Sequence, residues 1–426
     1  MYPHRIRLHG PWQYEPLART RITAEGRCET TSGSVPEPGR ARIPTTWRGT
    51  PLDGLRGRVR WRRPFHAPRS LDPGERLWVV FDGVDYFSEP SLNGVQLGRH
   101  EGYFEPFGYD VTSLVQPRNQ LVVDVDCPAE SAGSRRLIRG SLETTRPPFI
   151  GGMWGEVALE VRATCCLRDV RVRTMPSGPG GAIAVTGQTV GDPNTPLRVE
   201  LSLDGAWIAG EMIAASPEGA DWALEARLPQ VQPWWPWNLG EPRSYTARVD
   251  LHGNARTLDS ATFRVGFGRI ELDPVADSGR IHGRSIRFVR CEIEAGENPL
   301  DVSADEFERL RSRNDLDSQT TLLVRIAGRV VAPAVYELAD SLGIVLQQDF
   351  PWTGGGSSDP AFPDQAARQA RVMVQRLGHH PCIGLWSCPA ESGSADRAVI
   401  QAIASAIEDA DPTRPCALGV NWGPSP

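Results

Sequence analysis

Two acidic residues follow apolar runs that have the length of buried strands. Glu391 comes shortly after the run CIGLWSC, residues 382–388, and Asp349 ends the run GIVLQQD, residues 343–349. Apolar runs of this length are typical of parallel strands that are buried on both faces. In barrels of alternating strands and helices, chemistry takes place at the carboxyl ends of the strands. Two carboxyl groups held there could serve as a general acid and a general base.

The residues beside these acids leave two interpretations of Glu391 open. Trp386 lies in the strand before it, and an apolar ring would keep the carboxyl group partly desolvated and suited to donate a proton. The same glutamate could instead cap a helix that begins at Ser392 and have no other role. Asp349 stands near Trp352, and a carboxylate at a strand end beside aromatic rings favours contact with a ligand.

The segment 271–426 must position these acids. Amphipathic helix patterns alternate there with apolar runs, which predicts parallel βαβ units. Five strands are expected, at 286–290, 321–326, 343–349, 382–388 and 416–420. A closed barrel has eight strands and about 250 residues, whereas this segment has 156. We therefore expect a truncated (β/α) TIM-type barrel of about five strands, whose open side is covered by a homodimer or a partner subunit.

The rest of the chain reads as β structure, so the fold class is multidomain β plus α/β. Residues 1–163 contain short alternating runs such as RLWVVFDGV, separated by turn signals that include Asn-Gly. This pattern predicts a jelly-roll β-sandwich. Residues 164–270 repeat the pattern over about 100 residues, which predicts an immunoglobulin-like β-sandwich. The tryptophan cluster PWWPW in that second segment favours packing between domains over a ligand platform.

Composition excludes several classes of partner. The net charge of −6 lacks the basic surplus that nucleic acids or anionic membranes attract. Eight cysteines are scattered without metal-ligand spacing, and neither a dinucleotide fingerprint nor a Walker-type loop is present. We expect no cofactor and no metal. The amino terminus has no apolar leader and no run could cross a membrane, so a cytoplasmic location is the expectation.

Several stretches together resemble glycoside hydrolase family 2, in its β-mannosidase-like branch. HHPCIGLWSCPAES is similar to the family motif NHPSI..W..GNE, and GRVRWRRPFHAP, FDGVDYFSEPSLNGVQLG and GGMWGEVALEV resemble its opening jelly roll. The resemblance implies that Glu391 is the general acid/base. Ala390 stands where the family carries an asparagine that binds the sugar.

Two further motifs of the barrel resemble the family in part. IVLQQDFPW is similar to iLVWQDFmF, which implies that Asp349 lines the sugar subsite, and LLVRIAG is similar to N.lRvWGGG, which implies that Arg325 lies in the cleft. Arg329 occupies a position where the family has glycine. A structural ion pair inside the barrel is an equal interpretation of Arg325. We expect the site to comprise Glu391 and Asp349 as catalytic groups, with Arg325, Trp352 and Trp386 as substrate-binding residues.

Retaining hydrolysis needs a second carboxylate about 5 to 5.5 Å from the acid. In the family that nucleophile lies on a later strand, and the acids after Glu391 all fall in or beside a predicted outer helix: Asp396, Glu408, Asp409 and Asp411. We therefore expect a family 2-like protein that has lost retaining hydrolysis and uses its cleft to bind a small-molecule or carbohydrate ligand, or for another acid/base reaction. One alternative is an active exo-β-glycosidase completed by missing or partner-supplied strands. The other is a structural or interaction protein.

Overall fold

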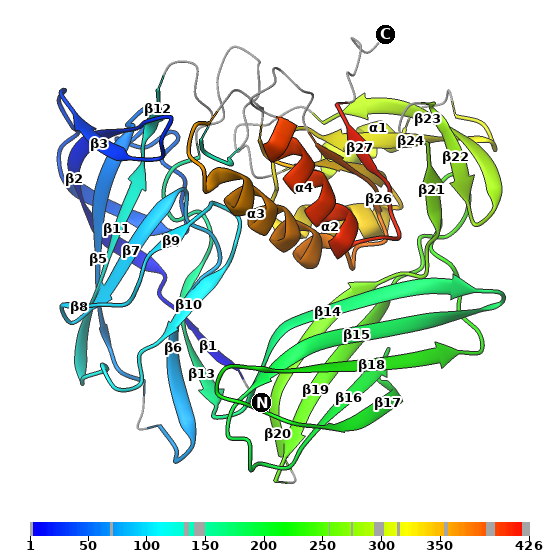
Figure 1. Cartoon of the computed structure of the whole chain (residues 1–426), viewed down its shortest axis with the longest axis horizontal. Coiled ribbons are helices and arrows are strands. Elements are labelled where there is room, and N and C mark those ends of the chain that lie inside the picture. Colours follow the sequence, from blue (N-terminus) through cyan, green and yellow to red (C-terminus); the bar gives the residue numbers. More distant parts are fainter. Residues whose placement is uncertain are drawn as a thin grey trace.

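The computed structural model describes the chain as two β-sandwiches and a half-barrel with helices (Figure 1). The described residues are 3–68, 71–131, 136–139, 150–254, 256–273, 276–293, 302–312, 316–352, 357–388 and 397–419. No helix in these ranges is long and apolar enough to cross a membrane. The predicted fold class is confirmed: a jelly roll, an immunoglobulin-like sandwich and a curled, open sheet of the TIM type.

The jelly roll, blue to cyan in Figure 1, consists of a four-stranded and a nine-stranded sheet. Inward-facing residues alternate with outward-facing ones along its long strands, and the apolar set, including Trp12, Trp61 and Val123, is fully buried between the sheets. The strands are β1 (His4–Arg7), β2 (Gly10–Ile22), β3 (Cys28–Thr31), β4 (Gly39–Ile43), β5 (Gly57–His66), β6 (Glu75–Phe81), β7 (Phe87–Leu92), β8 (Val95–Gln96), β9 (His100–Glu101), β10 (Phe107–Asp110), β11 (Arg118–Cys127), β12 (Ala129–Glu130) and β13 (Val157–Ala163).

The second sandwich, green in Figure 1, packs a three-stranded sheet on a four-stranded one. Its core is built from alternating residues such as Val185, Val199 and Val249, which are all fully buried. On the edge strand β17, the side chain of Trp207 is 59% exposed. The strands are β14 (Cys166–Ser177), β15 (Gly180–Val190), β16 (Leu197–Leu203), β17 (Ala206–Ile213), β18 (Ala220–Leu228), β19 (Tyr245–Gly253) and β20 (Arg256–Val265).

The half-barrel is a seven-stranded sheet whose last five strands are parallel, in the order β23-β24-β25-β26-β27. These are the five strands that the apolar runs predict. Its strands are β21 (Ile270–Leu272), β22 (Ser278–Ile281), β23 (Arg284–Glu292), β24 (Thr320–Ile326), β25 (Val345–Asp349), β26 (Ile383–Cys388) and β27 (Cys416–Leu418). The helices between them are α1 (Ala304–Arg311), α2 (Pro333–Leu342), α3 (Phe362–Leu377) and α4 (Arg397–Ala410).

Local sequence explains where these helices begin and end. Ser303 caps α1 by accepting a hydrogen bond from the Glu306 N–H, and proline occupies the first turn of α2 and α3. Gly343 ends α2 in the left-handed conformation at φ 72°, which favours glycine. The apolar residues of α3 recur at helical spacing and are buried: Ala366, Ala370, Met373, Val374 and Leu377.

The tryptophan cluster packs the second sandwich against the half-barrel, as the sequence favoured. Trp234 is fully buried and its indole N–H donates to the backbone oxygen of Asp340 in α2, 2.9 Å away. The jelly roll contacts the half-barrel through apolar residues such as Tyr103 and Phe104, which share its core, and through charged groups. Arg136 bridges Glu101 of the jelly roll and Asp359 just before α3, with a distance of 2.8 Å to each carboxylate. The half-barrel is therefore held on two sides.

Candidate functional site at the carboxyl edge of the barrel sheet

Charged side chains meet where β23, β24 and β25 end. The register places Glu292 beside Arg325 and Asp349 beside Ser387, so these residues lie on neighbouring strands and share one face of the sheet. Arg325 is central: its Nη2 atom lies 2.6 Å from Oδ2 of Asp349, and its Nη1 atom lies 3.5 Å from Glu292. The structure thus brings together Asp349 and Arg325, two of the residues expected in the site.

Asp349 is a buried carboxylate that accepts several hydrogen bonds. Its Oδ2 atom accepts from Nε of Arg325 at 2.8 Å and from the Gly328 N–H at 3.2 Å. Its Oδ1 atom accepts from the Ser387 hydroxyl and from Nε2 of Gln347. Only 5% of the residue is exposed. Donors on three strands and on the backbone therefore hold this carboxylate in one orientation.

Trp386 lies on the opposite face of the sheet from Asp349. It is fully buried, and its indole N–H donates to Oδ2 of Asp411, which follows α4, at 3.0 Å. The expectation that Trp386 joins the ligand site is therefore not supported by this placement: strand alternation turns the ring toward the helices. Trp352 is also buried, and its ring packs edge-on against Phe362 at the start of α3.

Glu391, the expected acid/base, lies outside the described residues. Three contributors to the charged edge are absent from the sequence-based site, namely Glu292, Gln347 and Ser387. Gln347 and Ser387 could have been found from strand alternation, because they lie on the face of Asp349. β23 ends at Glu292, two residues past the strand predicted at 286–290. Because of this boundary error, Glu292 was not included in the expected site.

Arg329 lies in the same region, three residues after the end of β24. It is 3% exposed, and its backbone oxygen accepts from Nε2 of Gln348 at 2.7 Å. Its Nη2 atom makes a long contact of 3.4 Å with the backbone oxygen of Ile293. Its Nε and Nη1 atoms have no hydrogen-bond partner within the described ranges. Burial lowers the pKa of this guanidinium, against the opposing influence of Tyr103, Tyr336 and Glu292.

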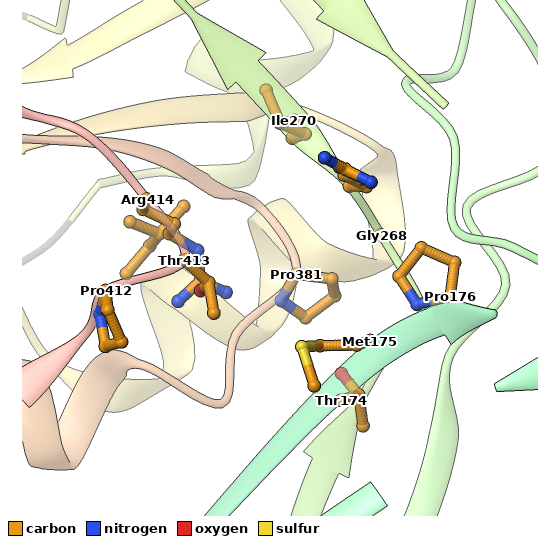
Figure 2. Close-up of a pocket in the computed structure, with 11 residues that line it drawn as sticks. Thr174, Met175, Pro176, Gly268, Ile270, Pro381, Pro412, Thr413 and Arg414 are labelled. Atoms are coloured by element: carbon orange, nitrogen blue, oxygen red, sulfur yellow. The ribbon is translucent and has the colours of Figure 1, made fainter. Parts of the chain in front are cut away.

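A separate pocket lies at the amino ends of the parallel strands, on the far side of the sheet from the charged edge (Figure 2). Its volume is about 340 Å³, and Met175 and Pro176 of β14 face Pro381 and Thr413 across it. Of the two arginines that line it, Arg414 is already engaged by the Asp411 carboxylate and by the backbone oxygens of Gly378 and His380. This pocket is a junction between the second sandwich and the half-barrel.

One group of possible metal ligands lies near that end of the sheet. Asp340, His380 and Cys382 are buried, with their ligand atoms within 4.8 Å of one another. Both carboxylate oxygens of Asp340 are in use, because Oδ2 lies 2.6 Å from Nδ1 of His380 and Oδ1 accepts from the Cys382 N–H at 3.0 Å. The three residues form a hydrogen-bonded unit that joins α2 to the start of β26.

Comparison with known proteins supports the family that the motifs suggest. Residues 56–158 match the sequence model of the glycosyl hydrolase 2 galactose-binding domain-like family. A β-galactosidase of Arthrobacter sp. (strain B7) is 29% identical over 378 residues, which cover 83% of this chain and 33% of the relative. β-Mannosidase B of Thermothelomyces thermophilus is 25% identical over 393 residues, which cover 83% of this chain and 45% of the relative. The chain thus spans less than half of the length of these two relatives.

Solved structures share the fold over nearly all of the chain. A GH2 β-galacturonidase from Eisenbergiella tayi, bound to galacturonate, matches with a TM-score of 0.77 and 18% identity, covering 98% of this chain and 72% of that one. The β-glucuronidase of Bifidobacterium dentium matches with a TM-score of 0.74 and 21% identity, covering 98% and 75%. Fold and sequence together define a glycosidase-like protein. The matched domain, the named relatives and the shared fold make this chain similar to proteins of glycoside hydrolase family 2.

Proposed function

We propose that this chain binds a saccharide at the carboxyl edge of its barrel sheet, and that its 426 residues do not carry out retaining glycoside hydrolysis by themselves. In this proposal Asp349 and Arg325 hold the sugar. Glu391 is the group available to donate or accept a proton. The relatives are named β-galactosidase, β-mannosidase and β-glucuronidase, so the ligand class that we propose is a β-linked glycoside.

The observation that carries this proposal is the set of hydrogen bonds to Asp349. A carboxylate that accepts from Arg325, Ser387, Gln347 and the Gly328 N–H is fixed in place. A carboxylate held in one orientation by four donors suits the positioning of a sugar hydroxyl. Asp349 is therefore proposed as a binding residue in place of the catalytic role expected from sequence.

The acids that follow Glu391 support the second half of the proposal. Asp411 is buried and binds Arg414 and Trp386 on the helix side of the sheet. Glu408 and Asp409 belong to α4, which also lies on that side. Asp396 lies outside the described residues. None of the three described acids is placed as a nucleophile opposite an acid at the carboxyl edge.

The length comparison favours a second candidate, an exo-acting β-glycosidase whose further strands complete the barrel. The chain covers only 33% of the Arthrobacter β-galactosidase and 45% of the fungal β-mannosidase. In this candidate the same edge binds the sugar, and a carboxylate from additional strands supplies the covalent step. The two candidates share their binding residues and differ in the source of the nucleophile.

Binding and hydrolysis should be measured separately on the 426-residue chain. We expect aryl β-mannosides, β-galactosides and β-glucuronides to show binding of at least one class by calorimetry, with no turnover above background. Asp349→Asn should weaken that binding by about tenfold or more, because it removes a charged acceptor. Turnover that is lost in Glu391→Gln would contradict the absence of hydrolysis and favour the second candidate.

Asp411→Asn is the matched control for this experiment. It removes an equally buried carboxylate that also pairs with an arginine, but on the helix side of the same sheet. We expect this variant to lose stability and to keep the affinity of the wild-type protein. Equal loss of binding in both variants would show that Asp349 acts only through the fold, and would contradict the proposed binding role.

A further inference from the structure

Two cysteines on neighbouring strands lie with their sulfur atoms in contact. The Sγ atoms of Cys388, the last residue of β26, and Cys416, the first residue of β27, are 3.6 Å apart. The register pairs Trp386 with Cys416 and Cys388 with Leu418, so the cysteines are diagonal neighbours on the helix side of the sheet. The cysteines are separated by 28 positions in the chain, and both are reduced.

The surroundings make the two thiols unequal. Cys388 is 4% exposed, whereas Cys416 is only partly buried and is the thiol that a reagent in solution can reach. The hydrogen bond to Cys416 and burial raise the pKa of the Cys388 thiol well above its ordinary value, and the charges of Asp349 and Glu408 act in the same direction. Cys416 is therefore placed to react first and Cys388 to react second.

β27 is short, which favours the small shift that would bring the Cys388 and Cys416 sulfur atoms within disulfide distance. A disulfide has an S–S distance of about 2.05 Å, so the sulfur atoms must close a gap of roughly 1.5 Å from the 3.6 Å contact. β27 has only three residues and is the edge of the described sheet, with β26 as its one paired neighbour there. A short strand held on one side can shift by this amount more easily than a strand in the sheet interior.

We propose that Cys388 and Cys416 form a reversible disulfide through exchange with a small-molecule disulfide such as oxidised glutathione. The Cys416 thiolate attacks one sulfur of the reagent, forms a mixed disulfide and releases one glutathione thiolate. The Cys388 thiolate then attacks the Cys416 sulfur and releases the second. Two protein thiols are oxidised, one reagent disulfide is reduced to two thiols, and the two protons pass to the released thiolates.

The bond would fasten the edge strand β27 to β26. It closes a loop that contains all of α4, so it restricts the unfolded chain and should stabilise the half-barrel. We expect the melting temperature of the oxidised protein to rise by about 5 °C. The pair would thus make the stability of the barrel edge depend on the thiol–disulfide balance around the protein.

The test uses the whole chain, oxidised and reduced glutathione, and alkylation of the remaining thiols before intact mass and peptide mapping. We expect oxidation to remove two of the eight alkylatable thiols, to yield a Cys388–Cys416 cross-linked peptide, and to be reversed by dithiothreitol. Eight alkylated thiols under oxidising conditions, or a cross-link between other cysteines, would overturn the proposal. An unchanged or lower melting temperature of the cross-linked form would contradict the predicted fastening of β27.

Three variants distinguish disulfide formation between Cys388 and Cys416 from the general reactivity of the other thiols. Cys388→Ser should retain a glutathione adduct on Cys416, because the second step is blocked, and Cys416→Ser should form neither adduct nor cross-link at this place. Cys28→Ser is the control: Cys28 is also partly buried, lacks a cysteine partner among the described residues, and burial raises its pKa to about 11. That variant should form the cross-link as the wild-type protein does, and its failure to do so would count against the pair.

Discussion

Asp349 and Arg329, two buried charged residues near the carboxyl edge of the sheet, differ in how many of their hydrogen bonds are satisfied. Asp349 accepts hydrogen bonds from two side chains of neighbouring strands, from Gln347 and from a backbone N–H, whereas Arg329 keeps two donor atoms without a partner within the described ranges. A buried charge that lacks partners costs several kcal/mol, and a well-paired one costs far less. The resemblance to the family places glycine at the position of Arg329, so this cation is an addition that the fold does not require.

Replacement of Arg329 should therefore stabilise the protein in the absence of ligand. We expect Arg329→Met to raise the free energy of unfolding by about 1–3 kcal/mol, because the apolar chain remains and the uncompensated charge is removed. Arg325→Met should have the opposite effect and lower it by about 3 kcal/mol, because it leaves Asp349 buried without its cation. Urea unfolding of the two variants gives both values. Destabilisation by Arg329→Met would show that this guanidinium has a stabilising partner.

At the scale of single elements, Asp411 joins β26 to the loop that follows α4. Its carboxylate accepts from Trp386 in β26, from Thr413 and from Arg414, directly after α4. Burial alone would raise its pKa, but Arg414, Thr413 and Trp386 together lower it below the ordinary value. A carboxyl group whose folded pKa is depressed contributes stability above its unfolded pKa of about 3.9, and this contribution is lost as the pH falls through the folded pKa.

Asp411→Asn should remove that contribution. We expect it to lower the free energy of unfolding at pH 7 by about 2–4 kcal/mol, because Arg414 is left partly buried without its anion. The difference between wild type and variant should shrink below pH 4, where the wild-type carboxyl group also becomes protonated. Urea midpoints at pH 7 and pH 3.5 test both statements. An equal difference at the two pH values would contradict the assigned pKa direction.

The elements themselves were largely predictable, and particular side chains were not. The five parallel strands and the buried stripe of α3 follow from apolar runs and helical periodicity, because burial on both faces imposes those patterns. The direction of Trp386 was missed although alternation along β26 sets it: Trp386 is the neighbour of Ser387, which shares the face of Asp349, so the ring points to the other face. The partners of Asp349 come from strands far apart in sequence, and no local pattern indicates them.

For the whole molecule, three partly buried histidines contribute to the response to acid. Burial lowers the pKa of His100, in the jelly roll, to about 3, and the charge of Arg368 acts in the same direction. Burial also lowers the pKa of His282 and that of His379. A histidine whose folded pKa is depressed binds protons more readily in the unfolded chain, so stability falls as the pH drops below about 6.5.

His100→Phe should reduce this sensitivity. The His100 ring stacks on Phe107 with centroids 4.0 Å apart, and a phenyl ring can keep that contact without titrating. We expect the wild-type protein to lose roughly 2 kcal/mol more than the variant between pH 7.5 and pH 5. Chemical unfolding at the two pH values measures the difference. Parallel losses in the two proteins would show that His100 is protonated equally in the folded and unfolded states.

Assembly is also a property of the whole molecule. Leu418 in the edge strand β27 is 56% exposed, and an apolar residue on an unpaired edge favours association. We propose that a second copy of the chain covers this side, and light scattering at micromolar concentration should give the mass of a homodimer. A compact, stable monomer under those conditions would contradict the proposal.

The exposed indole of Trp207 on β17 should differ in fluorescence quenching from the buried tryptophans. Trp207 is 59% exposed, whereas seven other tryptophans are buried: Trp12, Trp47, Trp61, Trp222, Trp234, Trp352 and Trp386. A water-soluble quencher such as acrylamide should therefore quench the fluorescence of Trp207 at lower concentrations than that of these seven rings. Trp207→Phe would remove that readily quenched emission without disturbing a core. In such a variant, a change in fluorescence on adding a saccharide would come from the remaining tryptophans, with Trp352 beside the start of α3 among them.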